Sequence, residues 1–144
     1  MVRIHLFPKE VFPIKVYYLC PDAHSPPLAA FMAGLEHKVR RKILTQLALL
    51  TLNPGMGEPH VKHFKQDRYI RLYELRTRSK VMLRIIFTFT EDGDILLLES
   101  FIKRHKRNTM QALEKSLQSL HLFSTGSCSC RELVINPTTL EVIE

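Results

Sequence analysis

Hydrophobic and polar positions follow two different periods along the chain. Residues 14–20 (IKVYYLC) are β-branched and aromatic, which is typical of a strand. Residues 28–35 (LAAFMAGL) follow Ser25-Pro26-Pro27, which predicts a short helix with Ser25 as its N-cap and proline in the first turn. A second helix ending at Asn53-Pro54-Gly55 is predicted by apolar residues at spacings of three and four, namely Leu35, Val39, Ile43, Leu47 and Leu50.

The middle of the chain predicts three consecutive antiparallel strands. Residues 69–77 (YIRLYELRT) and 81–90 (VMLRIIFTFT) have strand composition, and Glu91-Asp92-Gly93-Asp94 is a hairpin turn signal before residues 95–102. The run from Ile95 to Leu98 shows little alternation of apolar and polar residues. We therefore expect a central strand that helices cover on both faces.

A final helix and a tail are expected after these strands. Asn108 with Gln111 three residues later resembles an N-cap pair. The apolar stripe of this helix is Met110, Leu113, Leu117 and Leu120. After Phe123 a small-residue linker precedes residues 131–135 and 139–143, which predict either two short edge strands or a mobile tail. We expect one domain over residues 1–123 and a C-terminal extension over residues 124–144.

The composition of the chain indicates which class of molecule the protein binds. The chain has 144 residues, of which 45% are hydrophobic, enough for one domain with a buried core. It carries 21 Lys and Arg against 14 Asp and Glu, a net charge of +7 that favours nucleic acid, a membrane surface or an acidic protein. Three cysteines are too few for a disulfide framework. With neither a membrane-length apolar run nor a signal-peptide pattern, we expect a cytoplasmic protein without membrane contact.

Three short motifs carry a family resemblance: Tyr73-Glu74-Leu75-Arg76, Arg84-Ile85-Ile86-Phe87 and Phe101-Ile102-Lys103-Arg104. With the helices around them, they resemble the RelE/HigB toxin superfamily, in its phage-related HigB-like branch, over about residues 14–121. The resemblance implies an α+β, RelE-like fold, in which a small antiparallel-rich sheet carries an N-terminal helical hairpin and a packed C-terminal helix. The chain departs from the family pattern at residues 105–109, where a Thr/Gln turn ending in Pro is usual.

The resemblance also implies a function. Such a protein is the toxin of a type II toxin–antitoxin system, a ribosome-associated mRNA endoribonuclease that needs no metal or other cofactor. Its partners are mRNA on the ribosome and a cognate antitoxin, often with a helix-turn-helix part. The departure at residues 105–109 motivates an alternative, a non-catalytic RNA- or protein-binding module on the same scaffold. Pairing of the C-terminal strands with a second copy leaves a homodimer open.

Basic residues concentrate in the region of these motifs, with twelve Lys and Arg against six Asp and Glu between residues 60 and 107. When a ribose 2′-OH attacks the adjacent phosphate, guanidinium and ammonium groups stabilise the charge that builds on the phosphate oxygens. The resemblance assigns this task to Arg76, Arg84, Lys103 and Arg104, and His105 is the nearest candidate for proton transfer. The remaining candidates for RNA binding are Lys62, Lys65, Arg78, Lys80, Lys106 and Arg107.

Structural roles compete with these assignments. Glu74, Arg76 and Arg78 share one strand face, so Arg84 can also be a buried cation bridged to Glu74, which then positions the arginines. His105 can be an exposed loop residue without a catalytic task. The pairs His60/His63 and Cys128/Cys130 fall short of the four ligands usual for structural zinc, and we expect no metal.

Overall fold

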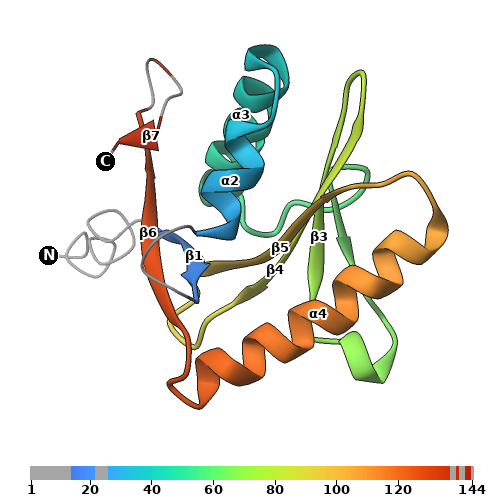
Figure 1. Cartoon of the computed structure of the whole chain (residues 1–144), viewed down its shortest axis with the longest axis vertical. Helices are drawn as coiled ribbons and strands as arrows, with labels where there is room; N and C mark the ends of the chain where they lie inside the picture. Colours follow the sequence, from blue (N-terminus) through green and yellow to red (C-terminus); the bar gives the residue numbers. More distant parts are fainter. Residues whose placement is uncertain (1–13, 22–25, 137–138, 140–141, 144) are drawn as a thin grey trace, which may run out of the picture.

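The computed structural model describes residues 14–21, 26–136, 139 and 142–143. Within this part, three helices and seven strands follow one another in an α+β order (Figure 1). The helices are α2 (Pro27–Ala33), α3 (His37–Leu52) and α4 (Lys106–Ser124). The strands are β1 (Val16–Cys20), β2 (Val61–His63), β3 (Tyr73–Arg78), β4 (Met82–Phe89), β5 (Ile95–Ile102), β6 (Ser129–Ile135) and β7 (Val142–Ile143), with a short 3₁₀ helix, η2 (Asp67–Tyr69), before β3.

The strands form one sheet in the order β2-β3-β4-β5-β1-β6-β7. Only β1 and β5 pair in parallel, and the other pairs are antiparallel. The first four residues of β5, Ile95 to Leu98, are all buried. The prediction of a central strand covered on both faces is therefore confirmed.

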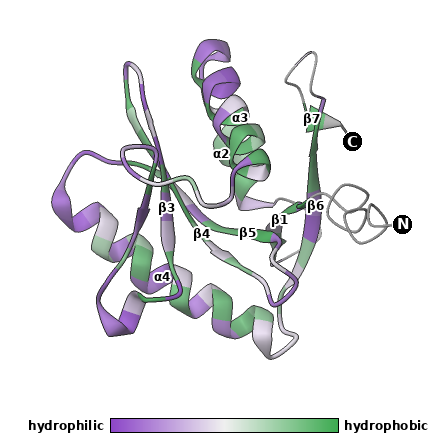
Figure 2. Cartoon of the chain, turned by 180° about the vertical axis from the view of Figure 1, so that it is seen from behind, coloured by the Kyte–Doolittle hydropathy of each residue, from purple (hydrophilic) through white to green (hydrophobic). Residues whose placement is uncertain are grey.

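Two apolar clusters lie on opposite faces of this sheet. One contains buried residues of α2 and α3, including Met32, Ile43 and Leu47. The other contains Leu113 and Leu120 of α4. Figure 2 shows hydrophobic colour where the helices meet the strands and hydrophilic colour on the first turns of α3 and α4. The predicted fold, an antiparallel-rich sheet with a helical hairpin and a C-terminal helix packed on it, is confirmed and is consistent with a RelE-like fold.

Local patterns located most element boundaries. Helix α3 buries Val39, Ile43, Leu47 and Leu50 and ends with Asn53 as its C-cap, as the spacing predicted, whereas Leu35, the first residue of the predicted stripe, precedes the helix. In the β4–β5 turn Gly93 has a φ of +85°, a conformation that favours glycine. The N-cap prediction for α2 is wrong. The N-cap is Pro26, while Ser25 lies outside the described residues.

Three further predictions require correction. The strand predicted from residue 69 begins only at Tyr73. The 3₁₀ helix η2 ends at Tyr69, and residues 70–72 connect it to β3. Helix α4 begins two residues before Asn108, with His105 as its N-cap. Asn108 still serves the cap, since its Oδ1 accepts the backbone N–H groups of Arg104 and His105, each at 2.8 Å. Met110 is 47% exposed, and its predicted place in the apolar stripe is wrong.

Residues 129–135 form β6, which lies beside β1 in the sheet. Strand β6 pairs antiparallel with all five residues of β1 and brings Leu133 into the cluster on the α3 face. Strand β7 pairs with Val134 and Ile135 at the far end of β6. The turn predicted at Asn136-Pro137 lies partly outside the described residues, because Pro137 is not described.

Cys128 and Cys130 are free thiols whose pKa values are raised by burial.

Candidate functional site

A buried carboxylate with two arginines lies in the middle of β3 and β4. Glu74 is 1% exposed, and its Oε1 accepts a hydrogen bond of 2.9 Å from Arg76 Nε. Arg84 Nε lies 3.7 Å from the same oxygen, and the Arg84 side chain is 8% exposed. Arg84 Nη1 also donates to its neighbour's carbonyl, Leu83 O, at 3.1 Å. The alternative in which Arg84 is buried and bridged to Glu74 is the arrangement that the structure has.

Strand register explains why these side chains meet. Arg76 lies directly opposite Arg84 in the antiparallel β3–β4 pair, and Lys62 of β2 lies opposite Glu74. Directly opposite residues project to the same face of a sheet, and so do residues two apart on one strand. Lys62, Glu74, Arg76 and Arg84 therefore share one face. Three cations around one carboxylate leave this face with excess positive charge.

Burial changes the electrostatics of Arg84. Desolvation lowers the pKa of its guanidinium, and the nearby Glu74 opposes this shift. Arg76 and Arg78 lower the pKa further, because they bring more positive charge close to Arg84. The three arginines thus repel one another, and only Glu74 offsets this within the cluster. Such a cluster attracts an anion strongly, because an anion relieves the repulsion.

A pocket of about 430 Å³ opens beside this cluster, between α3 and the edge of β3. Strand β2 pairs only with Tyr73 to Leu75, so Thr77 and Arg78 lie beyond its end. The pocket is lined by Lys42 and Gln46 of α3, by Pro59 and His60 before β2, and by Arg76, Thr77, Arg78 and Arg84 of the sheet. Lys42 Nζ donates to Arg78 O, which ties α3 to this edge. Two chain segments that are distant in sequence thus complete the arginine cluster.

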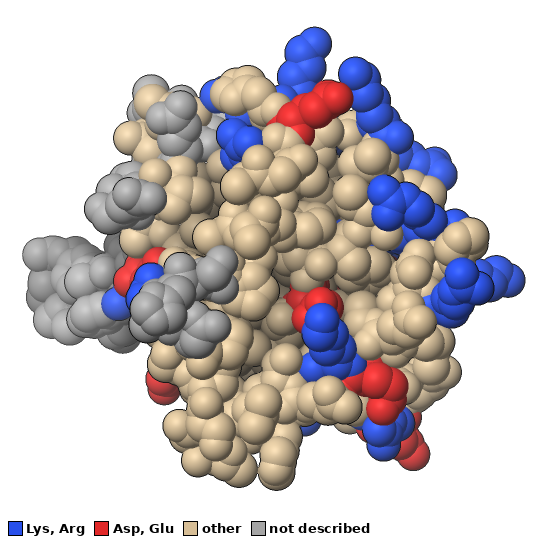
Figure 3. Space-filling model, in the orientation of Figure 1, with Lys and Arg blue, Asp and Glu red and all other residues tan. Residues whose placement is uncertain are grey.

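The turn between β5 and α4 places other predicted residues along the same side of the molecule. Lys103 N–H donates to Met82 O at 2.8 Å, which puts Lys103 at the start of β4. Arg104, His105, Lys106 and Arg107 are exposed and lead into α4. Figure 3 shows Lys and Arg side chains gathered along the upper right edge, from the β3–β4 turn to the start of α4. None of these five residues lines the pocket around Arg84.

The other predicted RNA-binding residues do not gather in one place. Arg78 lines the pocket, and Lys80 is exposed in the β3–β4 turn, 3.6 Å from Glu36. Lys62 Nζ lies 5.3 Å from the centre of the Phe64 ring on the face shared with Glu74. Lys65 contacts His63 Nδ1 at 3.3 Å and lines a different pocket, with Tyr73 and Phe89. Lys65 is therefore separate from the arginine cluster.

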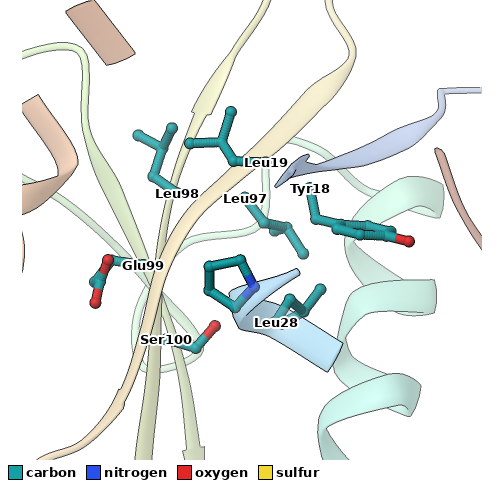
Figure 4. A pocket seen from close by; sticks show the side chains of 8 residues that line it. Tyr18, Leu19, Leu28, Leu97, Leu98, Glu99 and Ser100 are labelled. Atoms are coloured by element: carbon teal, nitrogen blue, oxygen red, sulfur yellow. The ribbon is translucent and has the colours of Figure 1, made fainter. Parts of the chain in front are cut away.

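A smaller pocket where α2, β1 and β5 meet is a poorer candidate. Its volume of about 50 Å³ has room for a water molecule or two. Figure 4 shows Tyr18, Leu28 and Leu97 around it, with the Glu99 side chain across the β5 strand from Leu28. Burial raises the pKa of Glu99, and Lys115, 3.5 Å away, partly offsets this. This pocket offers neither a cluster of charges nor room for a substrate.

Within the described ranges, no three His, Cys, Asp or Glu side chains come together as metal ligands. His63 instead stacks on Tyr73 with ring centroids 4.3 Å apart, and its Nε2 lies 2.7 Å from Ile70 O. The described helices include none that is long and apolar enough to cross a membrane.

One known family matches the sequence of this chain. The family model described as "Phage derived protein Gp49-like (DUF891)" matches residues 30–121. The chain belongs to this Gp49-like family. The matched region contains every residue that lines the pocket and extends through the β5–α4 turn to most of α4. Strands β1, β6 and β7 lie outside it. No curated protein matches the chain.

Five residues of the pocket were missed by sequence reasoning, namely Lys42, Gln46, Pro59, His60 and Thr77. In the sequence His60 was considered only as half of a weak metal-ligand pair, and the other four were assigned no role in a site. The i to i+4 spacing of Lys42 and Gln46 does place them on one face of α3. The sequence does not show which strand edge this face of α3 contacts, so no signal in it connects Lys42 and Gln46 to Arg76.

Proposed function

We propose that this Gp49-like protein is the toxin of a type II toxin–antitoxin system and cleaves mRNA on the ribosome. The single observation that carries the proposal is the convergence of Lys42, Arg76, Arg78 and Arg84 on one pocket. Membership of a family related to the RelE/HigB toxins supports it. A pocket with four cations fits a phosphodiester better than any uncharged substrate.

The proposed reaction needs no metal. The ribose 2′-hydroxyl loses its proton, and its oxygen attacks the adjacent phosphorus. The bond to the 5′-oxygen of the next nucleotide breaks and that oxygen takes up a proton, so a 2′,3′-cyclic phosphate and a 5′-hydroxyl result. Negative charge accumulates on the non-bridging oxygens, where preorganised guanidinium groups stabilise it. Glu74 keeps Arg76 and Arg84 in place and stays out of the reaction, because its carboxylate is buried against both. Lys103 and Arg104 hold the flanking backbone.

Proton transfer falls to His60 in this proposal. His60 is the one imidazole that lines the pocket, and its carbonyl accepts the Arg76 N–H at 2.8 Å, which fixes its backbone beside the cluster. Imidazole is the side chain best suited to exchange protons near neutral pH. His105, the earlier candidate, precedes the first turn of α4 outside this pocket.

One observation favours a second function, a non-catalytic binding module. The residues that line the pocket include no Asp or Glu, so a carboxylate base is missing from it. If His60 does not transfer a proton, the pocket binds RNA or an acidic protein segment through its cations alone. An antitoxin with acidic residues is the partner that such a surface would accept.

A translation extract tests the proposal. Purified protein is added to ribosomes translating a defined message, and the message is examined for new ends. We expect cuts within the translated frame, with 5′-hydroxyl ends downstream of each cut. An intact message in the presence of soluble, folded protein would leave the binding module as the better account.

A further inference from the structure

Buried polar atoms without a hydrogen-bond partner concentrate at the pocket beside α3. In the described part of the chain six side-chain N or O atoms are buried without a hydrogen-bond partner. Three of them, Gln46 Oε1, Thr77 Oγ1 and Arg84 Nε, belong to residues that line this pocket, and a fourth, Glu74 Oε2, belongs to the carboxylate that holds Arg76. More than nine in ten buried polar groups in proteins have a partner, so such a concentration needs an explanation.

The Thr77 hydroxyl is the clearest of these buried groups without a hydrogen-bond partner. Thr77 is 2% exposed, and strand alternation places it on the same face as Leu75, a buried member of the cluster under α3. Valine has nearly the same shape and would remove the cost of a buried, unpaired hydroxyl. A hydroxyl at this position is unfavourable for the unbound protein. It becomes favourable if a bound molecule supplies the partner.

The charges around these atoms indicate the class of that molecule. Lys42, Arg76 and Arg78 line the same pocket and select an anionic group, while Gln46 and Thr77 select a polar edge next to it. The volume of about 430 Å³ lies within the range of roughly 300–1,000 Å³ usual for small-molecule sites. A nucleotide combines a phosphate with a flat, hydrogen-bonding edge in one molecule of this size.

We propose that this pocket is a single-nucleotide subsite in which Gln46 and Thr77 hydrogen-bond the edge of the base. Gln46 Oε1 is an acceptor that lacks a donor, and each RNA base offers one: an amino N–H in adenine, cytosine and guanine, and the N3–H in uracil. Lys42, Arg76 and Arg78 bind the adjoining phosphate. The inference rests on the proposed function in one respect: the nucleotide belongs to an RNA chain and is not a free metabolite.

Direct binding tests the subsite without any need for cleavage. The purified full chain is titrated with AMP, CMP, GMP, UMP and inorganic phosphate, and with a short RNA that contains each base. We expect at least one of the four nucleotides to bind about fivefold or more tightly than inorganic phosphate, the size of effect expected for one hydrogen bond. The RNA should bind more tightly than any mononucleotide, whereas tighter binding of a free nucleotide would assign the site to a metabolite. Equal binding of all four nucleotides and phosphate would overturn the proposal.

Two variants distinguish a role of Gln46 and Thr77 in binding from a purely structural role. Thr77→Val and Gln46→Leu should lose the preference for a nucleotide over inorganic phosphate while keeping phosphate binding, and Thr77→Val should unfold at the same or a higher temperature than the parent. Gln118→Leu, at an exposed position of α4, is the matched control and should bind like the parent. Variants that discriminate as the parent does would contradict the subsite. If the parent prefers a nucleotide to inorganic phosphate but never cuts RNA, the subsite stands and the proposed cleavage fails.

Discussion

Arg76 Nε donates a 2.9 Å hydrogen bond to Glu74 Oε1, and both side chains project from the same face of β3. The same oxygen lies 3.7 Å from Arg84 Nε. One carboxylate therefore orients two arginines that strand register already places opposite each other. Glu74 is best understood as the positioning residue of the cluster.

Removing the negative charge of Glu74 should destabilise the fold strongly. Glu74→Gln leaves Arg84 buried without a counter-charge, and loss of one partner of a buried pair costs about 3–5 kcal/mol. The free energy of unfolding from urea titration measures this loss. Glu132→Gln on the exposed surface of β6 is the control and should change it by less than about 0.5 kcal/mol. A loss below about 1 kcal/mol for Glu74→Gln would mean that water, not Glu74, stabilises Arg84.

Acid should release a contact between η2 and α4. Arg68 donates to Glu114 through Nε at 2.7 Å and Nη2 at 2.5 Å, and the Tyr69 hydroxyl donates to the same carboxylate. The Arg68 hydrogen bond is the main reason that the pKa of Glu114 falls from 4.5 to about 2. A carboxylate whose pKa is lowered by folding stabilises the protein above its unfolded-state pKa, and this contribution is lost as pH falls through its folded-state pKa.

The corresponding experiment compares the parent with Glu114→Gln. Urea midpoints are measured at pH 7, 4.5 and 2.5. The parent should be the more stable protein at pH 7 and 4.5, and the difference should shrink toward pH 2.5. A difference that does not change with pH would show that Arg68 and Glu114 do not interact in solution.

Lys42 should contribute to RNA affinity without dictating sequence. It is an exposed helix residue at the pocket, and its ammonium group offers a phosphate contact. Lys42→Ala should weaken binding of a single-stranded RNA and reduce the slope of log K against log salt by about 0.7, the value for one phosphate contact. Lys38→Ala, one turn earlier on α3 and outside the pocket lining, is the comparison. An unchanged salt slope for Lys42→Ala would remove Lys42 from the site.

Assigning proton transfer to His60 or to His105 leads to different expected rates of cleavage in the variants. If His60 transfers the proton, His60→Gln should slow single-turnover cleavage by about a hundredfold. His121→Gln, at an exposed position near the end of α4, is the control. A loss of rate in His105→Gln together with a normal rate in His60→Gln would assign the proton to His105 and contradict the present assignment.

The sequence predicted the elements that depend on local pattern. Apolar spacing located α3, and the turn around Gly93 located the β4–β5 hairpin, because a helix stripe and a positive-φ turn are properties of neighbouring residues. The start of α4 was missed because Asn108 acts from the third helical position, accepting backbone groups before the helix. Asn at N-cap and Asn at N3 look alike in sequence.

The candidate site was only partly predictable for a different reason. Arg76 and Arg84 were found because their motifs resemble those of a family, and register then makes them neighbours. Lys42, Gln46 and His60 join them only through the packing of α3 and the residues before β2 against the edge of β3. That packing is a long-range property that local periodicity does not encode.

The most direct test of the central claim is the mapping of new 5′ ends on cellular mRNA after induction of the chain in a bacterium. The parent and Arg131→Ala, a control on the exposed surface of β6, should produce cuts within translated frames. Arg76→Ala, confirmed as folded by circular dichroism, should produce none. Intact messages with the folded parent protein, or equal cutting by Arg76→Ala, would contradict the claim that the arginine cluster cleaves mRNA.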